Sequence, residues 1–187
     1  MVSEFNTLAF NQGLSPSEMH AYVGNLISPS PSEEFKDEKF YDFDIAVVGL
    51  GFHHFDDPKL ATERLAKRLK RGGVLMIIDF LPHESFDGHS HGHSHGPGHQ
   101  HGEKKKKDDD DEHAVVMTQK EMTSAQHTVS HHGFKLEDVK SMFENAGVGK
   151  EFEAVELGDG VVFARSDGQE TRQDFKRSVF MARGFKE

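Results

Sequence analysis

Two adjacent histidines, His53 and His54, are the residues of this chain best suited to chemistry. Imidazole titrates near neutrality, so either ring could accept a proton from a substrate hydroxyl or amine as a general base. The pair follows Gly49 and Gly51, which allow the backbone to approach a ligand closely. The alternative is a structural role, in which one ring packs near the start of a helix and the other lines a pocket.

Other histidines could add to such a site. His131-His132, with His127 nearby, precedes a predicted helix and could equally belong to a polar loop. No HxxxH or other ligand spacing supports a metal site in these pairs, so we predict none there. Six of the 14 histidines lie between His89 and His101, and imidazole can bind Zn, Ni or Cu. Their Gly and Ser spacers impose no geometry, which favours low-complexity sequence over a selective site.

The elements that must position His53-His54 lie between Phe43 and Phe80. Ile45–Val48 and Val74–Ile78 are short apolar runs, typical of strands buried on both faces. With a helix between them, they form a right-handed parallel βαβ unit. Ligands bind beyond the carboxyl ends of such strands. We therefore expect the site at Gly49–His54 and in the loop at Asp79–Pro82.

The connecting helix has clear end signals. Asp57-Pro58 predicts its start, with Asp as N-cap and Pro at the first helical position, and Gly72-Gly73 predicts its end. Ala61, Leu65 and Leu69 follow one another at i, i+4 and i+8, so we expect them to face the sheet.

The flanking segments give weaker patterns. Apolar residues at helical spacing in residues 2–9 predict a helix that ends by Gly13. Glu18–Leu26 resembles a short strand with Gly24-Asn25 at its carboxyl end, and Ser28–Asp37 a loop or short helix. We expect a late helix that Gly147 ends, with the apolar stripe Leu136, Val139, Phe143 and Ala146.

Three short runs lie after this helix. Glu151–Leu157 and Arg177–Arg183 predict an antiparallel pair of strands at one sheet edge. Val161–Ala164 is a further short apolar run between them.

Length and composition limit the protein's class. We interpret the 187 residues as a single α/β domain, 1–187, interrupted by a His-, Lys- and Asp-rich insertion at 86–112 that we expect to be disordered. The net charge of −10 argues against nucleic acid as a partner, and no apolar run is long enough for a membrane span. The absence of cysteine fits a reducing compartment, and we expect a cytoplasmic protein.

The order of these elements resembles the carboxyl-terminal two-thirds of a class I S-adenosylmethionine-dependent methyltransferase. The likeness is greatest to the broad group that includes ubiquinone and menaquinone biosynthesis methyltransferases and many fungal small-molecule enzymes. The segments that carry it are FDIAVVGLGFHHFDDP, LAKRLKRGGVLMIID, HHGFKLEDVKSMFENAGV and RSVFMARGFK. In that order, the four segments are similar to four parts of the family's fold. These are the fourth strand with its loop, the helix with Gly-Gly and the fifth strand, the late helix, and the closing strand.

The resemblance implies a Rossmann-like methyltransferase sheet, mostly parallel with an antiparallel carboxyl-terminal pair. Relatives bind S-adenosylmethionine chiefly through a glycine-rich loop after the first strand and an acidic residue that ends the second. This sequence contains no GxGxxG, and it begins with MVSEF, which is similar to the helix after that acidic residue. We therefore expect an amino-terminally truncated domain that lacks the first two strands and has an exposed or newly paired edge.

The resemblance also implies the cofactor contacts and a small-molecule acceptor. Asn25, with Leu26, stands where relatives often carry an Asp that touches the adenine amino group, although Gly-Asn is also common in turns. Val48, Gly49 and Leu50 would pass beneath the methionine end of the cofactor. His53 and His54 are the candidate catalytic residues, yet methyl transfer mostly needs alignment, and many such enzymes have no base.

Three hypotheses follow. In the first, the chain is a methyltransferase that uses S-adenosylmethionine, and its truncated form is either active or inactive. In the second, it is a catalytically dead binding or regulatory remnant. In the third, it is a His-rich metal-binding protein on a degenerate scaffold. The sequence does not identify the acceptor, the methylated atom or the oligomeric state.

Overall fold

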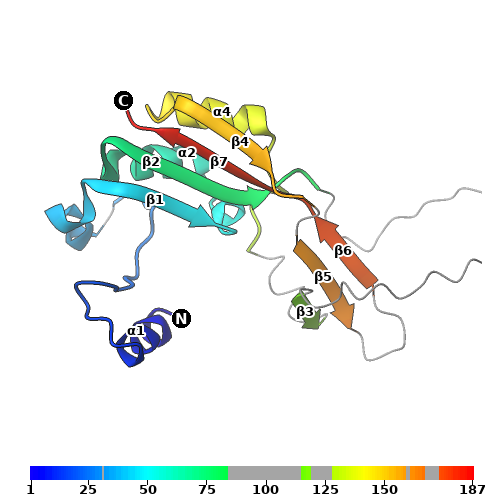
Figure 1. The fold of residues 1–187 in the computed structure, drawn as a ribbon, viewed down its shortest axis with the longest axis horizontal. Helices are drawn as coiled ribbons and strands as arrows, with labels where there is room; N and C mark the ends of the chain where they lie inside the picture. Colours follow the sequence, from blue (N-terminus) through cyan, green and yellow to red (C-terminus); the bar gives the residue numbers. More distant parts are fainter. Residues whose placement is uncertain (31, 84–114, 119–127, 159–160, 167–172) are drawn as a thin grey trace, which may run out of the picture.

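The structure of the chain is a computed structural model that describes residues 1–30, 32–83, 115–118, 128–158, 161–166 and 173–187 (Figure 1). The insertion predicted at 86–112, which contains the six clustered histidines, lies outside the described residues. His127 also lies outside them.

Four strands form the main sheet, in the order β1-β2-β7-β4. They are β1 (Phe43–Gly49), β2 (Leu69–Phe80), β7 (Val179–Phe185) and β4 (Lys150–Glu156). β1 and β2 run parallel and are joined by helix α2 (Pro58–Arg68), whereas β7 runs antiparallel to both β2 and β4. The predicted βαβ unit and the predicted antiparallel pair at a sheet edge are therefore confirmed, and the fold is a mixed α/β, Rossmann-like sheet.

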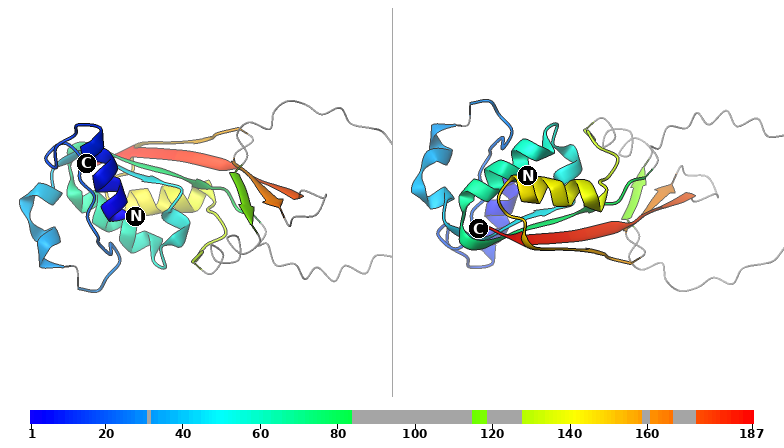
Figure 2. Two further views of the ribbon diagram at one scale, coloured as in Figure 1. Left: turned by 90° about the horizontal axis from the view of Figure 1, so that it is seen from below. Right: turned by 90° about the horizontal axis from the view of Figure 1, so that it is seen from above.

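Helices α2 and α4 (Leu136–Asn145) pack on one face of this sheet (Figure 2). Asp57 caps α2 as predicted, because its carboxylate accepts a hydrogen bond from the Leu60 N–H at 2.9 Å. The strands place alternate side chains between sheet and helices, and the core includes Ala46, Val48, Leu75, Ile77, Phe180 and Ala182 of the sheet with Ala61, Val139 and Phe143 of the helices. The carboxyl-terminal helix ends before Gly147, as the sequence predicts.

The prediction that α2 runs to Gly72-Gly73 is wrong. The helix ends at Arg68, and β2 begins at Leu69, which is 1% exposed and pairs with Phe43. Gly72 also donates a backbone hydrogen bond to the carbonyl of Lys186 at 2.9 Å, so pairing with distant segments draws residues 69–73 into the sheet. Leu65, which the sequence predicts to face the sheet, packs against the core but is only partly buried.

β1 is an edge strand of the main sheet, and the prediction that it is buried on both faces is wrong because one of its faces is open. Its Ile45 and Val47 are 52% and 53% exposed. They share the sheet face opposite α2 and α4 with further apolar residues of the other strands, namely Val74, Met76, Ile78, Val155 and Met181. Among the described residues, no helix packs on this face (Figure 2).

The amino-terminal segment lies beyond the β1 edge (Figure 1). Helix α1 (Val2–Asn11) forms where the sequence predicts it. The strand predicted at Glu18–Leu26 is absent, because among the described residues that segment pairs with no strand. The Asn6 side-chain amide instead accepts from the Ala21 N–H at 2.7 Å and donates to the Ala21 carbonyl at 3.1 Å. Residues 33–40 form the two short 3₁₀ helices η1 (Glu33–Lys36) and η2 (Glu38–Phe40).

A second sheet, which the sequence did not predict, has the order β3-β5-β6. It consists of β3 (Val115–Thr118), β5 (Val161–Ser166) and β6 (Gln173–Arg177). The apolar run at Val161–Ala164 forms most of its central strand. Within the described residues, the helices are all too short or too polar to cross a lipid bilayer.

Candidate active site at the carboxyl end of the central strands

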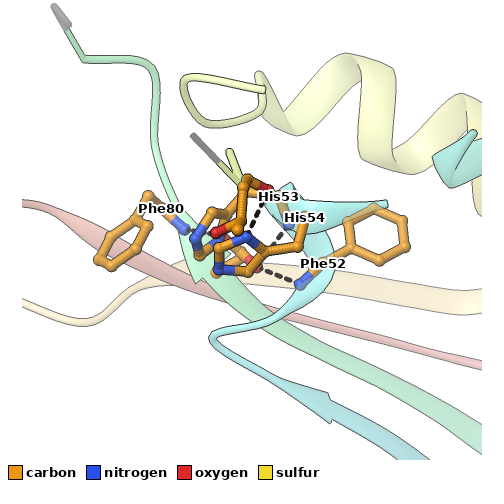
Figure 3. A network of polar contacts seen from close by, with 6 residues as sticks. Phe52, His53, His54 and Phe80 are labelled. Atoms are coloured by element: carbon orange, nitrogen blue, oxygen red, sulfur yellow. Dashed lines mark hydrogen bonds and ion pairs between the residues drawn. The ribbon is translucent and has the colours of Figure 1, made fainter. Parts of the chain in front are cut away.

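Asp79, near the end of β2, organises the carboxyl edge of the sheet. It is fully buried, and its two carboxylate oxygens accept four hydrogen bonds. Oδ2 accepts from the backbone N–H groups of Phe52 at 2.7 Å and His53 at 3.2 Å. Oδ1 accepts from the Phe80 N–H at 2.7 Å and from Nδ1 of His53 at 2.8 Å. The carboxylate thereby fixes the turn η3 (Phe52–His54) against the end of β2 (Figure 3).

These contacts set the orientation of the His53 ring. A carboxylate that already accepts three N–H groups is the acceptor for Nδ1 as well, so Nδ1 carries the hydrogen and Nε2 is the basic nitrogen. His53 is 7% exposed, and its ring packs on Phe80 with the centroids 5.1 Å apart. A buried carboxylate that fixes the tautomer of a histidine is a suitable arrangement for a general base.

His54 lies outside this pair, against the loop at residues 128–134. Its ring is 4.1 Å from that of His53, centroid to centroid, and its Nδ1 donates to the Thr128 carbonyl at 2.7 Å (Figure 3). The same loop donates two backbone hydrogen bonds to the His53 carbonyl, from Ser130 at 3.0 Å and His131 at 3.1 Å. His54 therefore binds the loop at residues 128–134. Of the two histidines, only His53 is hydrogen-bonded to a carboxylate.

Gly133 brings this loop onto β2. Its φ of +86° suits glycine, and a Cβ there would overlap the backbone of Leu81. The next residue, Phe134, donates its N–H to the Phe80 carbonyl at 2.9 Å, and its ring packs on Phe52 with a centroid separation of 5.0 Å. A glycine is thus required where the loop closes on the strand.

The residues expected near the methionine end of the cofactor also reach this edge. Val48 packs into the core, Gly49 ends β1, and Leu50 donates its N–H to the Ile78 carbonyl at 2.8 Å. Apart from the two chain neighbours of Gly49, no described residue has an atom within 4 Å of where a Cβ on Gly49 would be, and Leu50 is 43% exposed. Val48, Gly49, Leu50, His53 and His54 thus belong to one edge of the sheet.

Asn25 and Leu26 are not brought to that edge. They line a pocket with Phe43, the first residue of β1, whereas the histidines follow the last residue of this strand. The Asn25 side-chain oxygen accepts from the Ile27 N–H at 3.0 Å, which is the turn role considered as the alternative. The Leu26 carbonyl accepts from Nη1 of Arg64 at 2.7 Å.

His131 and His132 contribute mainly through their backbone. The His131 ring packs on Phe134, 5.4 Å between centroids, and its Nε2 is buried with no hydrogen-bond partner among the described residues. The His132 carbonyl accepts from the His83 N–H at 3.1 Å. In the described part of the chain, no three His, Asp or Glu side chains are placed to hold a metal ion.

Sequence reasoning missed the role of Asp79, although it placed the loop that Asp79 opens. The available signal was a single carboxylate directly after the apolar run Val74–Ile78. A charged group at the end of a buried strand must find donors, and the nearest unpaired N–H groups belong to the turn after the parallel neighbour β1. Gly133 and the Thr128 carbonyl gave no such local signal.

Among known proteins, the chain resembles only solved structures. No protein-family model matches the chain, and no curated protein matches it. Among solved structures, the YcgJ protein from Bacillus subtilis is similar with a TM-score of 0.54 and 13% identity, over 100% of this chain and 78% of that one.

Two other solved structures are less similar. One is a putative O-methyltransferase from Nostoc punctiforme, with a TM-score of 0.47 and 15% identity over 95% of this chain and 39% of that one. The other is an S-adenosylmethionine-dependent methyltransferase from Thermotoga maritima, a possible histamine N-methyltransferase. Its TM-score is 0.39 and its sequence identity is 18%, over 79% of this chain and 57% of that one. The mixed sheet, with its parallel β1–β2 pair and antiparallel β7 and β4, is a Rossmann-like α/β fold.

Proposed function

We propose that this chain contributes the acceptor-binding half of a methyltransferase that moves a methyl group from S-adenosylmethionine to a small molecule with a hydroxyl or amine group. The observation that carries the proposal is the His53–Asp79 pair, 2.8 Å apart at the carboxyl edge of a parallel βαβ unit. Ligands of open α/β sheets bind at this edge. The sequence segments that resemble class I methyltransferases support the same reaction class.

The residues present fit one end of the cofactor only. The open backbone at Gly49 and Leu50 suits the methionine moiety, because among the described residues no side chain lies against Gly49 and Leu50 is 43% exposed. Asn25 and Leu26 line a pocket at the other end of β1, so in this arrangement they do not complete an adenine site. When bound, S-adenosylmethionine would supply a methyl group on a sulfonium, which needs a nucleophile in line with the methyl–sulfur bond.

The chain's own residues would prepare that nucleophile. Nε2 of His53 is the nitrogen suited to accept a proton from the acceptor, because Asp79 holds the hydrogen on Nδ1. His54 and the loop at 128–134 would limit access of water to the edge, since they cover His53 from outside. Proximity and orientation would account for the rest of the rate enhancement.

We further propose that the active protein has more structure on the β1 side, consistent with an amino-terminally truncated domain. Most large apolar side chains that are exposed in the described residues lie within residues 1–50, among them Phe10 at 74%, Leu8 at 61% and Val47 at 53%. Parallel strands generally occur in sheets with both faces covered, and unpaired edges favour association. A further strand on β1 and helices on the open face would cover Ile45 and Val47.

The experiment uses the chain joined to a strand, a glycine-rich loop, a helix and a second strand that can pair with β1. Transfer of tritiated methyl to a panel of phenols, catechols and amines is measured for the parent, His53→Gln and His54→Gln. We expect His53→Gln to lower kcat by about 100-fold or more, and His54→Gln to keep most of it. Equal activity of His53→Gln and the parent contradicts the assignment of His53 as base.

A second candidate is a binding or regulatory module without catalysis. The partial fit to the cofactor favours it, because Asn25 is engaged in a turn and Asp79 is saturated by internal hydrogen bonds. If the joined protein binds S-adenosylmethionine and transfers no methyl group to any acceptor tested, this candidate replaces the first.

A further inference from the structure

A pocket of about 460 Å³ lies at the end of the sheet where β1 begins. The start of β1 is on the left in Figure 1. Its walls come from the start of β1, the carboxyl-terminal half of α2 and the segment at 22–41. The polar and aromatic residues among them are Tyr22, Asn25, Phe35, Lys36, Phe40, Tyr41, Phe43, Arg64, Lys67 and Arg68. Because β1 runs from Phe43 to Gly49, this pocket is separate from the edge that carries His53 and Asp79.

The charge of the lining has one sign. Among the described residues, four cationic side chains and no Asp or Glu line the pocket, and one of the four, Lys36, pairs with Glu33 at 2.6 Å. Three of them, Arg64, Lys67 and Arg68, are spaced i, i+3 and i+4, so they lie on one face of α2. Among the described residues none of these three forms an ion pair, although the chain has a net charge of −10. A cationic pocket in an acidic protein selects anions.

Backbone carbonyls hold the two guanidinium groups in place. Nη1 of Arg64 donates to the carbonyls of Leu26 at 2.7 Å and Ser28 at 2.6 Å. Nη1 of Arg68 donates to the carbonyls of Phe35 at 3.4 Å and Phe40 at 3.1 Å. Neutral carbonyls leave the positive charge uncompensated, and a guanidinium has five N–H groups. Each arginine is therefore positioned in advance and keeps donors for an anion.

Aromatic rings form the other wall. Tyr22 and Phe35 pack on Phe40 with centroid separations of 5.0 Å and 4.9 Å. Tyr22, Tyr41 and Phe43 remain 38%, 39% and 40% exposed. The Arg68 guanidinium lies 5.2 Å from the centre of the Tyr41 ring, so cation and ring meet at one place. Exposed ring faces beside cations suit a planar ring that carries a negative charge.

We propose that this pocket binds a planar aromatic or heteroaromatic anion, in which the ring packs on the tyrosines and Phe43 and a carboxylate, sulfonate or phosphate contacts Arg64, Lys67 and Arg68. S-adenosylmethionine is a poor match, because its sulfonium and ammonium give it a net positive charge. The pocket is thus a site of its own, and it does not depend on the proposed methyl transfer.

The test titrates naphthoate into the full chain and follows binding by calorimetry. Naphthalenemethanol, which lacks the charge, and acetate, which lacks the ring, are titrated in parallel. We expect naphthoate to bind with a dissociation constant below about 1 mM, and each of the other two compounds to bind at least about tenfold more weakly. Equal binding of naphthoate and naphthalenemethanol, or no heat from naphthoate up to about 10 mM, overturns the proposal.

A matched pair of variants locates the site. Lys67 lines the pocket, whereas Lys59 lies on the same helix outside it, and both side chains are exposed. Lys67→Glu should weaken naphthoate binding about tenfold, and Lys59→Glu, with the same change of net charge, should alter it less than about twofold. Equal effects of the two variants mean that the anion responds to overall charge alone, which also overturns the proposal. Equal unfolding midpoints of both variants and the parent show that folding is intact.

Discussion

Replacing Asp79 by Asn tests the geometry of the candidate active site. The carboxylate is fully buried and accepts N–H groups from Phe52, His53 and Phe80 and the Nδ1–H of His53. Asparagine has one oxygen, so its NH₂ must face two of these donors. The least unfavourable arrangement puts NH₂ at the Oδ1 position, where His53 can accept through Nδ1, and leaves only the Phe80 N–H without a partner.

This arrangement fixes both the size and the nature of the effect. One orphaned buried N–H, together with the loss of charge from the remaining bonds, should lower the free energy of unfolding by about 2 to 4 kcal/mol. The hydrogen of His53 should move to Nε2, so the ring loses its basic nitrogen on the side away from Asp79. The Asp79→Asn variant should therefore change the tautomer of His53, which a simple loss of packing would not do.

Two measurements check this prediction. Urea unfolding followed by circular dichroism gives the stability, and NMR of the imidazole nitrogens gives the tautomer of His53. Asp57→Asn is the matched control, because Asp57 is an exposed helix cap and Asn caps helices as well as Asp does. If Asp79→Asn unfolds at the same midpoint as Asp57→Asn and His53 keeps its tautomer, the hydrogen-bond network described above is wrong.

Three further predictions concern other parts of the fold. Gly133→Ala should destabilise the chain by about 3 kcal/mol or more, and Gly147→Ala by about 1 kcal/mol. Both glycines have a positive φ, but of the two only Gly133 lies where a Cβ would overlap the backbone of Leu81. Equal unfolding midpoints of the two variants would contradict this prediction. Leu69→Ala should cost about 2 to 5 kcal/mol, since Leu69 is 1% exposed, and a cost below about 1 kcal/mol would place it outside the core. Hydrogen bonds from the side-chain hydroxyl and then the backbone N–H of Ser15 lower the pKa of Glu18. The contribution of Glu18 to stability is therefore present at neutral pH and is lost as pH falls through that lowered pKa. Ser15→Ala should raise the pKa of Glu18 in an NMR titration, and an unchanged pKa refutes the contact.

Local patterns were sufficient to predict the elements that carry the site. The apolar runs in β1 and β2, the Asp57-Pro58 cap and the stripe of α4 each depend on residues close in sequence. They gave the βαβ unit, the antiparallel pair and the placement of His53 at the carboxyl edge. The fold class followed from the order of these elements.

The failures arise where distant segments decide the conformation. Leu69 looked helical because the run before Gly72 is helix-compatible, yet pairing with Phe43 and the bond from Gly72 to the Lys186 carbonyl make it a strand. Glu18–Leu26 has strand-like composition, but no neighbouring strand pairs with it in this structure. The role of Asp79 depends on N–H groups 26 and 27 residues earlier, which no local pattern reveals.

Binding of S-adenosylmethionine by isothermal titration tests the central proposal most directly. The measurement compares the 187-residue chain with the chain joined to the strand, glycine-rich loop, helix and strand described above. Because a neutral hydrogen bond contributes only about 1 kcal/mol, we predict a dissociation constant no better than about 1 mM for the chain alone. The joined chain should bind at least about a hundredfold more tightly. Micromolar binding by the chain alone contradicts the proposal that it needs completion, and the absence of tighter binding after joining contradicts a methyltransferase site at this edge.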